Sequence, residues 1–251
     1  MFAKERRDQI VQTVNEEGRA TVGDLVKRFG VTEDCIRKDL KLLDSQGLLR
    51  RVYGGAMSLT QTPELYVERR LDDNLRQKQA IARKAYELIR PGETLFLDVS
   101  TTNLALADLI ATGNKQVMVV SNMLNVLHRL ADCPTVKVLG TGGLVDAKLN
   151  GFSGTIALQM LESFRFDRAF LGAFAVNEDT GEAFTYDPDD GAIKRQALQT
   201  SSYAVLVAEE RKFGGSSSFC FARLEELDAV VCDNPRPDLA RKLEGFGCDL
   251  L

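Results

Sequence analysis

The chain has 251 residues, which is long enough for two domains, one of them small. Its hydrophobic content of 44% and charged content of 27% are those of an ordinary globular protein. The formal net charge is −4, and it is unevenly divided. Residues 1–58 hold eleven Lys/Arg and nine Asp/Glu (+2), and the remainder holds 21 and 27 (−6). With a negative net charge, the molecule as a whole does not attract a polyanion such as DNA. A polyanion must therefore bind to a local basic surface.

Neither membrane insertion nor metal chemistry is indicated. The apolar runs are shorter than a membrane span, and the N-terminal MFAKERRDQI lacks the apolar core of a signal peptide. We therefore expect a cytoplasmic protein. Its five cysteines are scattered, odd in number and without a C-x-x-C pair, which indicates neither a disulfide framework nor a zinc site. We expect small buried side chains at Cys35, Cys133, Cys220, Cys232 and Cys248, and no cofactor.

The N-terminal residues predict two amphipathic helices. The first covers residues 4–17 and is expected to bury Ile10, Val11 and Val14 while Arg6, Arg7 and Asp8 remain exposed. The second has apolar side chains at i, i+3, i+4 and i+7, namely Val22, Leu25, Val26 and Phe29. Gly30 then ends it before a tight turn.

A third helix follows with one apolar and one charged face. Thr32 is a typical N-cap residue, and Ile36, Leu40 and Leu43 follow at helical spacing. The opposite face carries Glu33, Asp34, Arg37, Lys38 and Lys41. Helix, glycine-containing turn and capped helix together are typical of a helix-turn-helix, whose second helix enters the major groove of DNA.

A basic hairpin is predicted directly after this helix. Gly47 ends the helix, residues 48–53 form a short strand with Arg50 and Arg51, and Gly54-Gly55 favours a hairpin turn before a return strand over 56–59. Beside a DNA-reading helix such a hairpin is a wing, placed to touch phosphates or the minor groove. The alternative is that the helix and the hairpin only pack against the rest of the domain, and that their charged side chains face solvent and bind nothing. We predict a winged helix-turn-helix domain over residues 1–59.

Residues 60–74 are expected to form a polar, partly helical connector, and a different pattern begins at residue 75. Buried strands alternate with helices, which indicates an open parallel α/β sheet over residues 75–251. The predicted helices cover residues 76–89, 103–112, 123–131, 154–163 and 190–201. The predicted strands cover residues 94–97, 117–120, 136–139, 169–171, 204–207 and 229–231.

Polar or glycine-rich residues follow these strands, at the edge where open α/β sheets bind ligands. The first strand leads into Asp98-Val99-Ser100-Thr101-Thr102 at a helix start, which suits a phosphate, and the second leads into Ser121-Asn122. Glycines end the third and fourth strands, and residues 209–214 (EERKFG) follow the fifth. Each segment alone is compatible with a simple cap or turn. Together they predict a pocket for a phosphorylated polyol.

The whole chain resembles the DeoR family of bacterial transcriptional regulators, which join a winged helix-turn-helix to a sugar-phosphate-sensing domain related to ribose-phosphate isomerase. The segment VTEDCIRKDLKLLDSQGLLRRVYGGA carries the N-terminal likeness, although Cys35 stands where Thr is usual and Lys38 where Arg is usual. The resemblance implies that Thr32, Arg37, Lys38, Arg50, Arg51 and Tyr53 face DNA. With Cys35 and Lys41 of the same helix they form the expected DNA-binding set.

The sensor likeness runs from Lys78 to the end and implies a Rossmann-like sheet with an effector pocket. The expected effector-binding residues are Asp98, Ser100, Thr101, Thr102, Asn122, Gly142, Gly143, Asp190, Lys194 and Lys212. Ser100 and Ala175 stand where the family usually has Gly, and Glu209 stands where it has Asp. These larger side chains favour an effector different from the simplest sugar phosphates.

The resemblance implies a repressor of a carbohydrate catabolism operon that binds operator DNA and a phosphorylated sugar or polyol. With one weakly basic DNA-binding domain per chain, a homodimer or homotetramer is expected. The alternative is a sugar-phosphate isomerase or transferase-like enzyme fused to a DNA-binding module, with Asp98, Asp190, Glu209 and Lys212 as an acid/base set. The single histidine, His128, lies in a helical pattern, and no nucleophile–base pair can be assigned. A third possibility is a degenerate sensor that serves only dimerisation.

Overall fold

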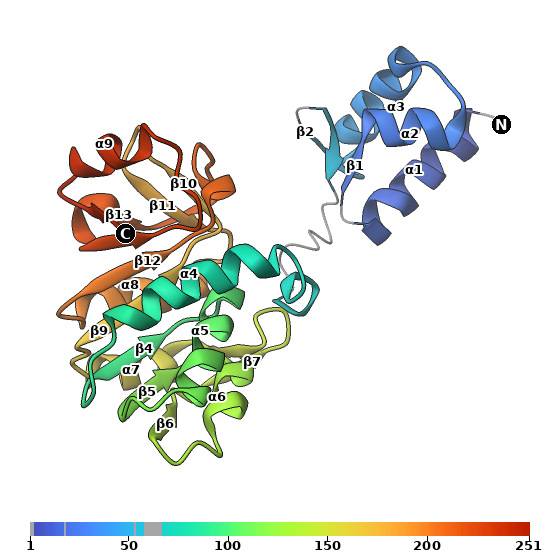
Figure 1. The fold of residues 1–251 in the computed structure, drawn as a ribbon. Coiled ribbons are helices and arrows are strands. Elements are labelled where there is room, and N and C mark those ends of the chain that lie inside the picture. The colour runs from blue at the N-terminus through green and yellow to red at the C-terminus, as the bar shows by residue number, and fades with distance from the viewer. Residues whose placement is uncertain (1–2, 18, 53, 58–66) are drawn as a thin grey trace. The chain divides into compact units, whose positions relative to one another are not determined.

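The computed structural model describes residues 3–17, 19–52, 54–57 and 67–251. The chain forms two compact units, Met1–Arg70 and Leu71–Leu251 (Figure 1), and the division falls inside the predicted connector. Tyr53, Ser58 and Leu59 of the predicted hairpin and residues 60–66 of the predicted connector lie outside the described residues. Across the described part of the chain, no helix combines the length and the apolar character needed to cross a membrane.

The first unit consists of three helices and a small sheet. The helices are α1 (Ala3–Glu17), α2 (Val22–Phe29) and α3 (Glu33–Ser45), and the strands are β1 (Arg19–Thr21), β2 (Arg50–Val52) and β3 (Gly55–Met57). The apolar faces predicted from the sequence meet in one core, made of Ile10, Val14, Ala20, Val22, Leu25, Ile36, Leu40, Leu43, Leu49 and Ala56. The three helices therefore pack as the hydrophobic periodicity predicts.

Local capping sets the turn between α2 and α3. The Thr21 hydroxyl accepts a hydrogen bond from the backbone N–H of Asp24, and Gly30 ends α2 in the left-handed conformation. The Thr32 hydroxyl then accepts from the backbone N–H of Cys35 at the start of α3. Each cap satisfies a backbone group that the helix end would otherwise leave without a partner. The predicted helix-turn-helix is confirmed.

One side chain of α1 lies where the sequence did not predict it. Arg6, expected to be exposed, is buried, and its Nε donates to Asp39 Oδ2 of α3 over 2.7 Å. Arg7 lies 3.7 Å from the other Asp39 oxygen. Asp39 falls between the apolar positions Ile36 and Leu40, so helical periodicity places it at the edge of the core, where its charge needs a partner. The expectation for Arg6 was wrong because periodicity does not reveal an ion pair between distant helices.

The hairpin belongs to a three-stranded antiparallel sheet in the order β1-β3-β2. Strand β1 was not predicted, because its three residues between two helices carry too little pattern. Gly55, expected in the turn, is the first residue of β3 and pairs with Thr21 and Val52. The sharp turn falls instead at Gly54, which has a positive φ of 79°.

The second unit is built on a parallel sheet of seven strands in the order β15-β14-β12-β9-β4-β5-β6. The strands are β4 (Thr94–Leu97), β5 (Val117–Ser121), β6 (Val136–Gly140), β9 (Arg168–Gly172), β12 (Ala204–Val207), β14 (Ala229–Val231) and β15 (Asp249–Leu250). The six predicted strands are confirmed with small changes in their ends. The edge strand β15 was missed because it has only two residues.

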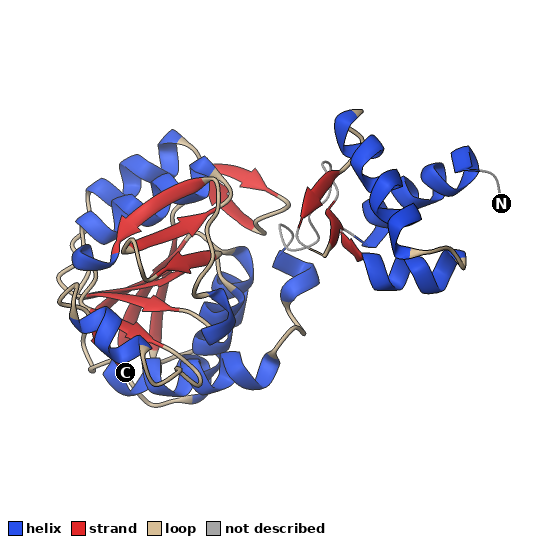
Figure 2. Ribbon diagram, turned by 90° about the horizontal axis from the view of Figure 1, so that it is seen from above, coloured by secondary structure: helices blue, strands red, loops and turns tan. Residues whose placement is uncertain are grey.

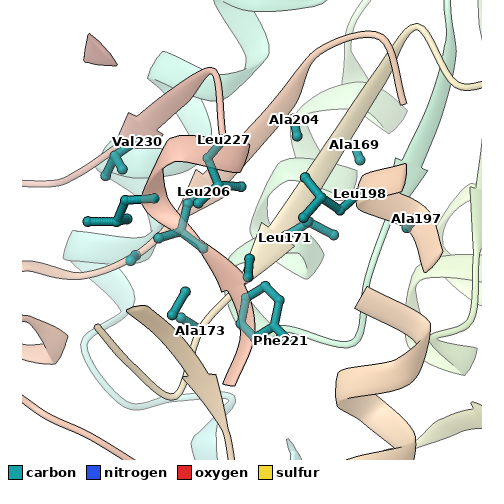
Figure 3. Packing of buried hydrophobic residues seen from close by; sticks show 14 of the residues in the cluster. Ala169, Leu171, Ala173, Ala197, Leu198, Ala204, Leu206, Phe221, Leu227 and Val230 are labelled. Carbon is teal, nitrogen blue, oxygen red and sulfur yellow. The ribbon is translucent and has the colours of Figure 1, made fainter. Parts of the chain in front are cut away.

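Helices cover both faces of this sheet (Figure 2). Helices α4 (Leu75–Leu88), α5 (Thr101–Thr112) and α6 (Leu124–Leu130) pack side by side. Helices α7 (Thr155–Glu162) and α8 (Pro188–Gln199) pack against the opposite face, where Leu171, Leu206 and Val230 share a core with Leu198 and Phe221 (Figure 3). The alternate residues of each strand therefore face different helix layers, as expected for a doubly covered sheet.

Smaller elements complete the second unit. A second sheet has the order β10-β11-β13, and a hairpin joins β7 to β8. Their bounds are β7 (Leu144–Asp146), β8 (Gly151–Ser153), β10 (Ala175–Asn177), β11 (Glu182–Thr185) and β13 (Phe219–Arg223), and a last helix is α9 (Leu239–Glu244). Single-turn 3-10 helices lie at η2 (Val67–Arg70), η3 (Glu210–Lys212) and η4 (Leu224–Glu226). The connector was expected to be partly helical, and η2 lies in it. The other elements were not predicted, since each is short and its packing or pairing partner is distant in sequence.

The strand order reverses between β4 and β9. From β4 the chain proceeds outward to β5 and β6, and it then returns to β9 on the other side of β4 and proceeds outward to β12, β14 and β15. Connections leave the two central strands in opposite directions, which opens a crevice at their carboxyl ends. Asp98 directly follows β4 at this point, and Gly172 is the last residue of β9.

The close pairing of β1 with β3 generates a stability prediction. A Cβ added at Gly55 would lie 2.2 Å from the Ala20 carbonyl oxygen and 3.0 Å from Thr21 Cα, both of them backbone atoms. We expect Gly55→Ala to lower the unfolding free energy of the first unit by about 1–3 kcal/mol, because the strands must move apart. Urea unfolding followed by circular dichroism measures this loss.

The matched control is Gly23→Ala in α2, where the nearest atom to an added Cβ is the Thr21 hydroxyl oxygen at 3.8 Å. Alanine is favoured over glycine inside a helix by about 0.5–1 kcal/mol, so this variant should be as stable as the parent or more stable. Equal stability of the two variants would contradict the pairing of β1 with β3.

Candidate functional site

The outer face of α3 is a charged surface. Arg37, Lys38 and Lys41 are exposed, and Arg37 Nη2 lies 2.8 Å from Glu33 Oε2 one turn earlier. An exposed i,i+4 ion pair of this kind is weak, so a stronger anionic partner can replace the Glu33 carboxylate. The expected basic face of α3 is therefore available for contact.

Two further residues of the expected DNA-binding set lie in the first turn of α3. Thr32 is exposed and uses its hydroxyl as the helix cap, and Cys35 is half-buried with its backbone N–H bound to that hydroxyl. The Thr32 hydroxyl thus serves the helix itself. The Cys35 thiol has no described disulfide partner.

The wing, made of β2 and β3, is attached to α3. The backbone N–H of Arg51 donates to Asp44 Oδ1 over 3.0 Å, which holds β2 against the last turn of α3. Arg50 and Arg51 are both exposed on β2. Between the wing and α3 lies an open groove of about 460 Å³, lined by Val22, Arg37, Leu40, Arg51, Val52, Gly54 and Gly55. Arg37 and Arg51 thus border one groove from opposite sides.

The second unit buries a charged cluster at the point where the strand order reverses. Asp98 is fully buried, and its Oδ2 accepts hydrogen bonds from the Gly172 backbone N–H at 2.7 Å and from Lys194 Nζ of α8. Its Oδ1 accepts from Asn103 Nδ2 at 2.7 Å. The carboxylate therefore joins β4, β9, α5 and α8, and each of its two oxygens already has a protein donor.

Asp190 completes the cluster. Its Oδ1 lies 3.3 Å from Lys194 Nζ, and its Oδ2 accepts a hydrogen bond from the Thr185 hydroxyl at 2.7 Å. Burial raises the pKa of the Asp190 carboxyl above its ordinary range. Burial by itself would lower the pKa of the Lys194 ammonium, but Asp190 and Asp98 outweigh it and raise that pKa. Two buried carboxylates thus share one ammonium group.

The start of α5 lies beside this cluster. Thr101 and Thr102, expected in a loop before the helix, are its first two residues and are both buried. Ser100 is the N-cap, and its hydroxyl accepts from the Asn103 backbone N–H at 3.0 Å. The N–H groups of Thr101 and Thr102 have no acceptor within the helix, as for any first helical residues. This end of α5 can donate hydrogen bonds to an anion.

Asn122 is fully buried at the end of the neighbouring strand β5. The Asn122 side-chain Nδ2 donates to the backbone carbonyl oxygen of Phe152 at 3.1 Å. The backbone carbonyl oxygen of Asn122 accepts from the backbone N–H of Phe152 at 2.7 Å. Both bonds attach the end of β5 to β8.

The two expected glycines follow β6. Gly142 and Gly143 have positive φ angles of 66° and 117°. A Cβ at Gly143 would lie 2.6 Å from the Ser153 carbonyl oxygen of β8, so only glycine allows this close approach.

Lys212 lies on the loop after β12 and reaches the same edge of the sheet. Its Nζ donates to the Ala173 carbonyl oxygen at 2.6 Å, one residue beyond β9. The buried Glu178 anchors this loop by accepting a hydrogen bond from the Gly214 backbone N–H at 2.6 Å. Glu178 also forms ion pairs with Arg236 and Lys242. All the expected effector residues therefore lie on the carboxyl-end loops or on α5 and α8.

Several contributors to this cluster were not predicted. Asn103, Gly172 and Thr185 each bind Asp98 or Asp190 directly. The sequence could have suggested that Asn103 binds Asp98. Asn103 is the third residue of a helix that Ser100 caps, and from this position its side-chain amide can reach the end of the preceding strand. Gly172 acts through its backbone, and Thr185 comes from the unpredicted strand β11, so neither had a sequence signal.

The single histidine and the five cysteines are further reactive side chains. His128 is exposed on α6. Cys232 and Cys248 are buried as expected, and burial raises the pKa of each thiol to about 12, whereas Cys35, Cys133 and Cys220 are only half-buried. Among the residues that the structure describes, no three His, Cys, Asp or Glu side chains gather as metal ligands.

Two family matches together span most of the chain. Residues 6–62 match the family described as DeoR-like helix-turn-helix domain, and residues 73–234 match the family described as DeoR C terminal sensor domain. The glycerol-3-phosphate regulon repressor of Escherichia coli (strain K12) is 30% identical, over 94% of this chain and 93% of the relative. The lactose phosphotransferase system repressor of Staphylococcus aureus (strain N315) is 32% identical, over 93% of each.

A solved structure is similar to part of the chain. Ribose 5 phosphate isomerase A from Neisseria gonorrhoeae matches 54% of this chain and 52% of its own, with 18% sequence identity and a TM-score of 0.40.

The buried cluster generates a pH-dependent stability prediction. Lys194→Met leaves the carboxylates of Asp98 and Asp190 buried without a cation, which should cost about 3–5 kcal/mol of unfolding free energy at pH 7. The folded variant then takes up protons more readily than the unfolded chain, so its stability should rise as the pH falls from 8 to 5. In the parent, the contribution of Lys194 is fully present below its ordinary pKa of about 10.4 and is lost as the pH rises from there through the raised folded pKa.

Urea unfolding at pH 5, 6.5 and 8 measures both effects. Lys148→Met, the same change at an exposed lysine, serves as the control and should show neither effect. A loss in Lys194→Met that stays constant across these pH values would argue against a shared buried charge.

Proposed function

Because the chain belongs to the DeoR family of transcriptional regulators, we propose that it represses a carbohydrate catabolism operon and is released from its operator by a phosphorylated sugar or polyol. The observation that carries the effector half of this proposal is the buried Asp98–Lys194–Asp190 cluster beside the donor end of α5, where the strand order reverses. The names of the relatives, two of them repressors of carbohydrate-related systems, support the regulatory half.

We place the phosphate of the effector at the start of α5. The N–H groups and hydroxyls of Thr101 and Thr102 can donate to its oxygens, and the helix N-terminus favours negative charge. Lys212, held at the Ala173 carbonyl oxygen, is the counter-charge. Ser100 contributes by capping the helix, and Gly142 and Gly143 let the backbone after β6 approach the ligand. The sugar hydroxyls then lie toward Asp190 and Asn122.

The arrangement of the buried cluster supports ligand binding without catalysis. Asp98, a candidate acid/base in the enzyme alternative, has both oxygens occupied by protein donors. Such a group holds structure and charge and is not free to exchange a proton with a substrate. Since the relatives reported above are named repressors, regulation is favoured over isomerase or transferase chemistry.

For DNA we assign base contacts to α3 and phosphate contacts to the wing. Arg37, Lys38 and Lys41 lie on the exposed face that the major groove admits, with Thr32 and Cys35 at its N-terminal end. Arg50 and Arg51 are suited to contact the phosphates of the DNA backbone or the minor groove. Tyr53 is assigned with them from the family resemblance alone.

We also propose a homodimer or homotetramer. Residues 1–58 carry a charge of only +2, so one domain can neutralise few phosphates. Two domains on paired half-sites, about 34–36 Å apart or a multiple of this spacing, would add their contacts.

The DNA assignment predicts different effects for the two elements. Arg37→Ala should cost about 1–3 kcal/mol of binding free energy and relax base preference, because a base contact is lost. Arg50→Ala and Arg51→Ala should weaken binding to every sequence and reduce the slope of log affinity against log salt by about one each. Gel-shift titrations at two salt concentrations, with a duplex selected by the protein and an unrelated duplex, separate the two patterns.

Lys137→Ala, at an exposed lysine on β6, is the control and should bind both duplexes as the parent does. Parental affinity in all three arginine variants would exclude the assignment of α3 and the wing to DNA.

The effector assignment predicts a separation of ligand response from DNA binding. Thr101→Ala removes a hydroxyl that donates to the phosphate, and Lys212→Ala removes its counter-charge. Since a hydrogen bond to a charged group is worth about 1.5–3 kcal/mol, each change should weaken ligand binding by at least about tenfold. Calorimetric titration with a panel of sugar and polyol phosphates, together with DNA release, measures the response.

Thr112→Ala, at the exposed far end of α5, is the matched control and should respond like the parent. DNA binding in the absence of ligand should persist in all these variants. The pocket is misplaced if Thr101→Ala responds to the same ligand with parental affinity.

A further inference from the structure

Three large apolar side chains of the second unit are mostly exposed to solvent. Within the described residues, Leu144, Val145 and Ile156 are 73%, 62% and 65% exposed, whereas no other large apolar side chain exceeds 47%. Single exposed apolar residues are common on protein surfaces, but a group of them marks a surface that contacts another molecule. We call these three residues the apolar patch.

The members of the apolar patch lie close together although they belong to two elements. Leu144 and Val145 are consecutive residues of β7, and Ile156 is the second residue of α7. A Cβ added at Gly154, the N-cap of α7, would lie 3.5 Å from Leu144 Cδ1. Leu144 therefore covers the start of the helix that carries Ile156, and the patch is continuous from β7 to α7.

The hairpin that carries the patch is anchored to the rest of the second unit. The backbone N–H of Phe152 in β8 donates to the Asn122 carbonyl oxygen at 2.7 Å, and the backbone N–H of Leu124 donates to the Asn150 carbonyl oxygen at 2.8 Å. Leu149, in the turn of the hairpin, is buried. Within the described residues β7 pairs only with β8, so it is the outer strand. Its exposed side chains are therefore presented on a strand that is held in place.

The segment around the patch contains few charges. Residues 138–161 include one acidic residue, Asp146, and one basic residue, Lys148, whereas 27% of the whole chain is charged. Depletion of charged residues is typical of the core of a protein–protein interface. With one lysine and no arginine, the segment offers too little positive charge for DNA or for an anionic membrane surface. Its chemistry is that of a contact with protein.

A second copy of this chain suits the charge of this surface. Residues 59–251 carry a net charge of −6, so two copies of the second unit repel one another as whole bodies. Residues 138–161 have no net charge, and two copies can approach there without an excess of like charges. Across a two-fold axis the same surface lies on both sides of the contact, and an uncharged apolar surface is complementary to itself.

We propose that the apolar patch is the surface through which two copies of this chain associate, patch against patch across a two-fold axis. The proposal rests on the proposed function, which requires at least a dimer on paired half-sites but does not say which surface forms it. In this contact Leu144, Val145 and Ile156 of both copies are removed from water together. Helix α3 and the wing take no part in the association.

The experiment uses the full-length chain and two double variants of opposite charge. Leu144→Asp with Val145→Asp, and Leu144→Lys with Val145→Lys, each place like charges against the second copy. Both positions are exposed within one chain, so the fold should accept the changes. Sedimentation velocity at about 0.01–100 μM protein should show a dimer or tetramer for the parent and at least about 100-fold weaker association for each variant.

An equimolar mixture of the two double variants should recover the association, because aspartates of one copy then face lysines of the other. Leu75→Asp is the matched control. Leu75 is the first residue of α4, lies outside the patch and is 47% exposed, so this variant should associate as the parent does. Circular dichroism should give the parental spectrum for every variant, which separates loss of association from loss of the fold.

The outcomes distinguish the patch from the proposed function. If the parent is a dimer or tetramer and both double variants keep that state, the patch is not the contact, while the proposed function stands. This is also the result expected if an unrelated protein covers the patch. If the variants dissociate and their mixture does not reassociate, the patch does not face its own copy, and the proposal fails. A parent that is a monomer at every concentration, with and without a DNA duplex, overturns the proposed homo-oligomer and the patch contact together.

Discussion

A carboxylate buried without solvent must be bound on every side, and Asp98 meets this requirement by joining four elements of the second unit. Its oxygens bind the end of β9 through Gly172, the first turn of α5 through Asn103, and α8 through Lys194. Removing one partner would leave an uncompensated charge in the interior, so these elements can move apart only at high cost. The position of the α5 N-terminus, and with it Thr101 and Thr102, depends on this one group.

The same constraint gives the site its chemical polarity. Lys194 is shared by two carboxylates, so the cluster holds more acidic groups than basic ones, and the first N–H groups of α5 are donors beside it. The phosphorylated polyol of the proposed function carries both an anion and hydroxyl groups, which is why it was proposed for this edge of the sheet.

In the first unit, polar contacts keep the helix and the wing in one arrangement. Asp39 binds Arg6 inside the unit, and Arg37, Lys38 and Lys41 remain on the exposed face of α3. Asp44 holds the backbone of Arg51, which fixes where β2 leaves α3. The two basic elements therefore form one surface, which gathers positive charge locally although residues 1–58 carry a net charge of only +2.

Local signals in the sequence were sufficient for the elements whose information lies within a few residues. The caps at Thr32 and Gly30, the apolar stripe of Ile36, Leu40 and Leu43, and the six longer strands of the parallel sheet were all predicted, because period and capping are short-range properties. Polar residues after those strands were enough to suggest the ligand-binding edge, since all carboxyl ends of a parallel sheet lie on one side.

What only the tertiary structure decided depends on partners far apart in the chain. The pairing of Arg6 with Asp39, the strand β1, the second sheet and the donors of Gly172 and Thr185 have no local pattern that could reveal them. The strand ends predicted that Asp98 and Asn122 would lie near one edge, and the family resemblance added Asp190 and Lys194. The sequence did not determine which protein groups each of these side chains would bind, because that is set by contacts between β4, β8, β11 and α8 that form only in the folded chain.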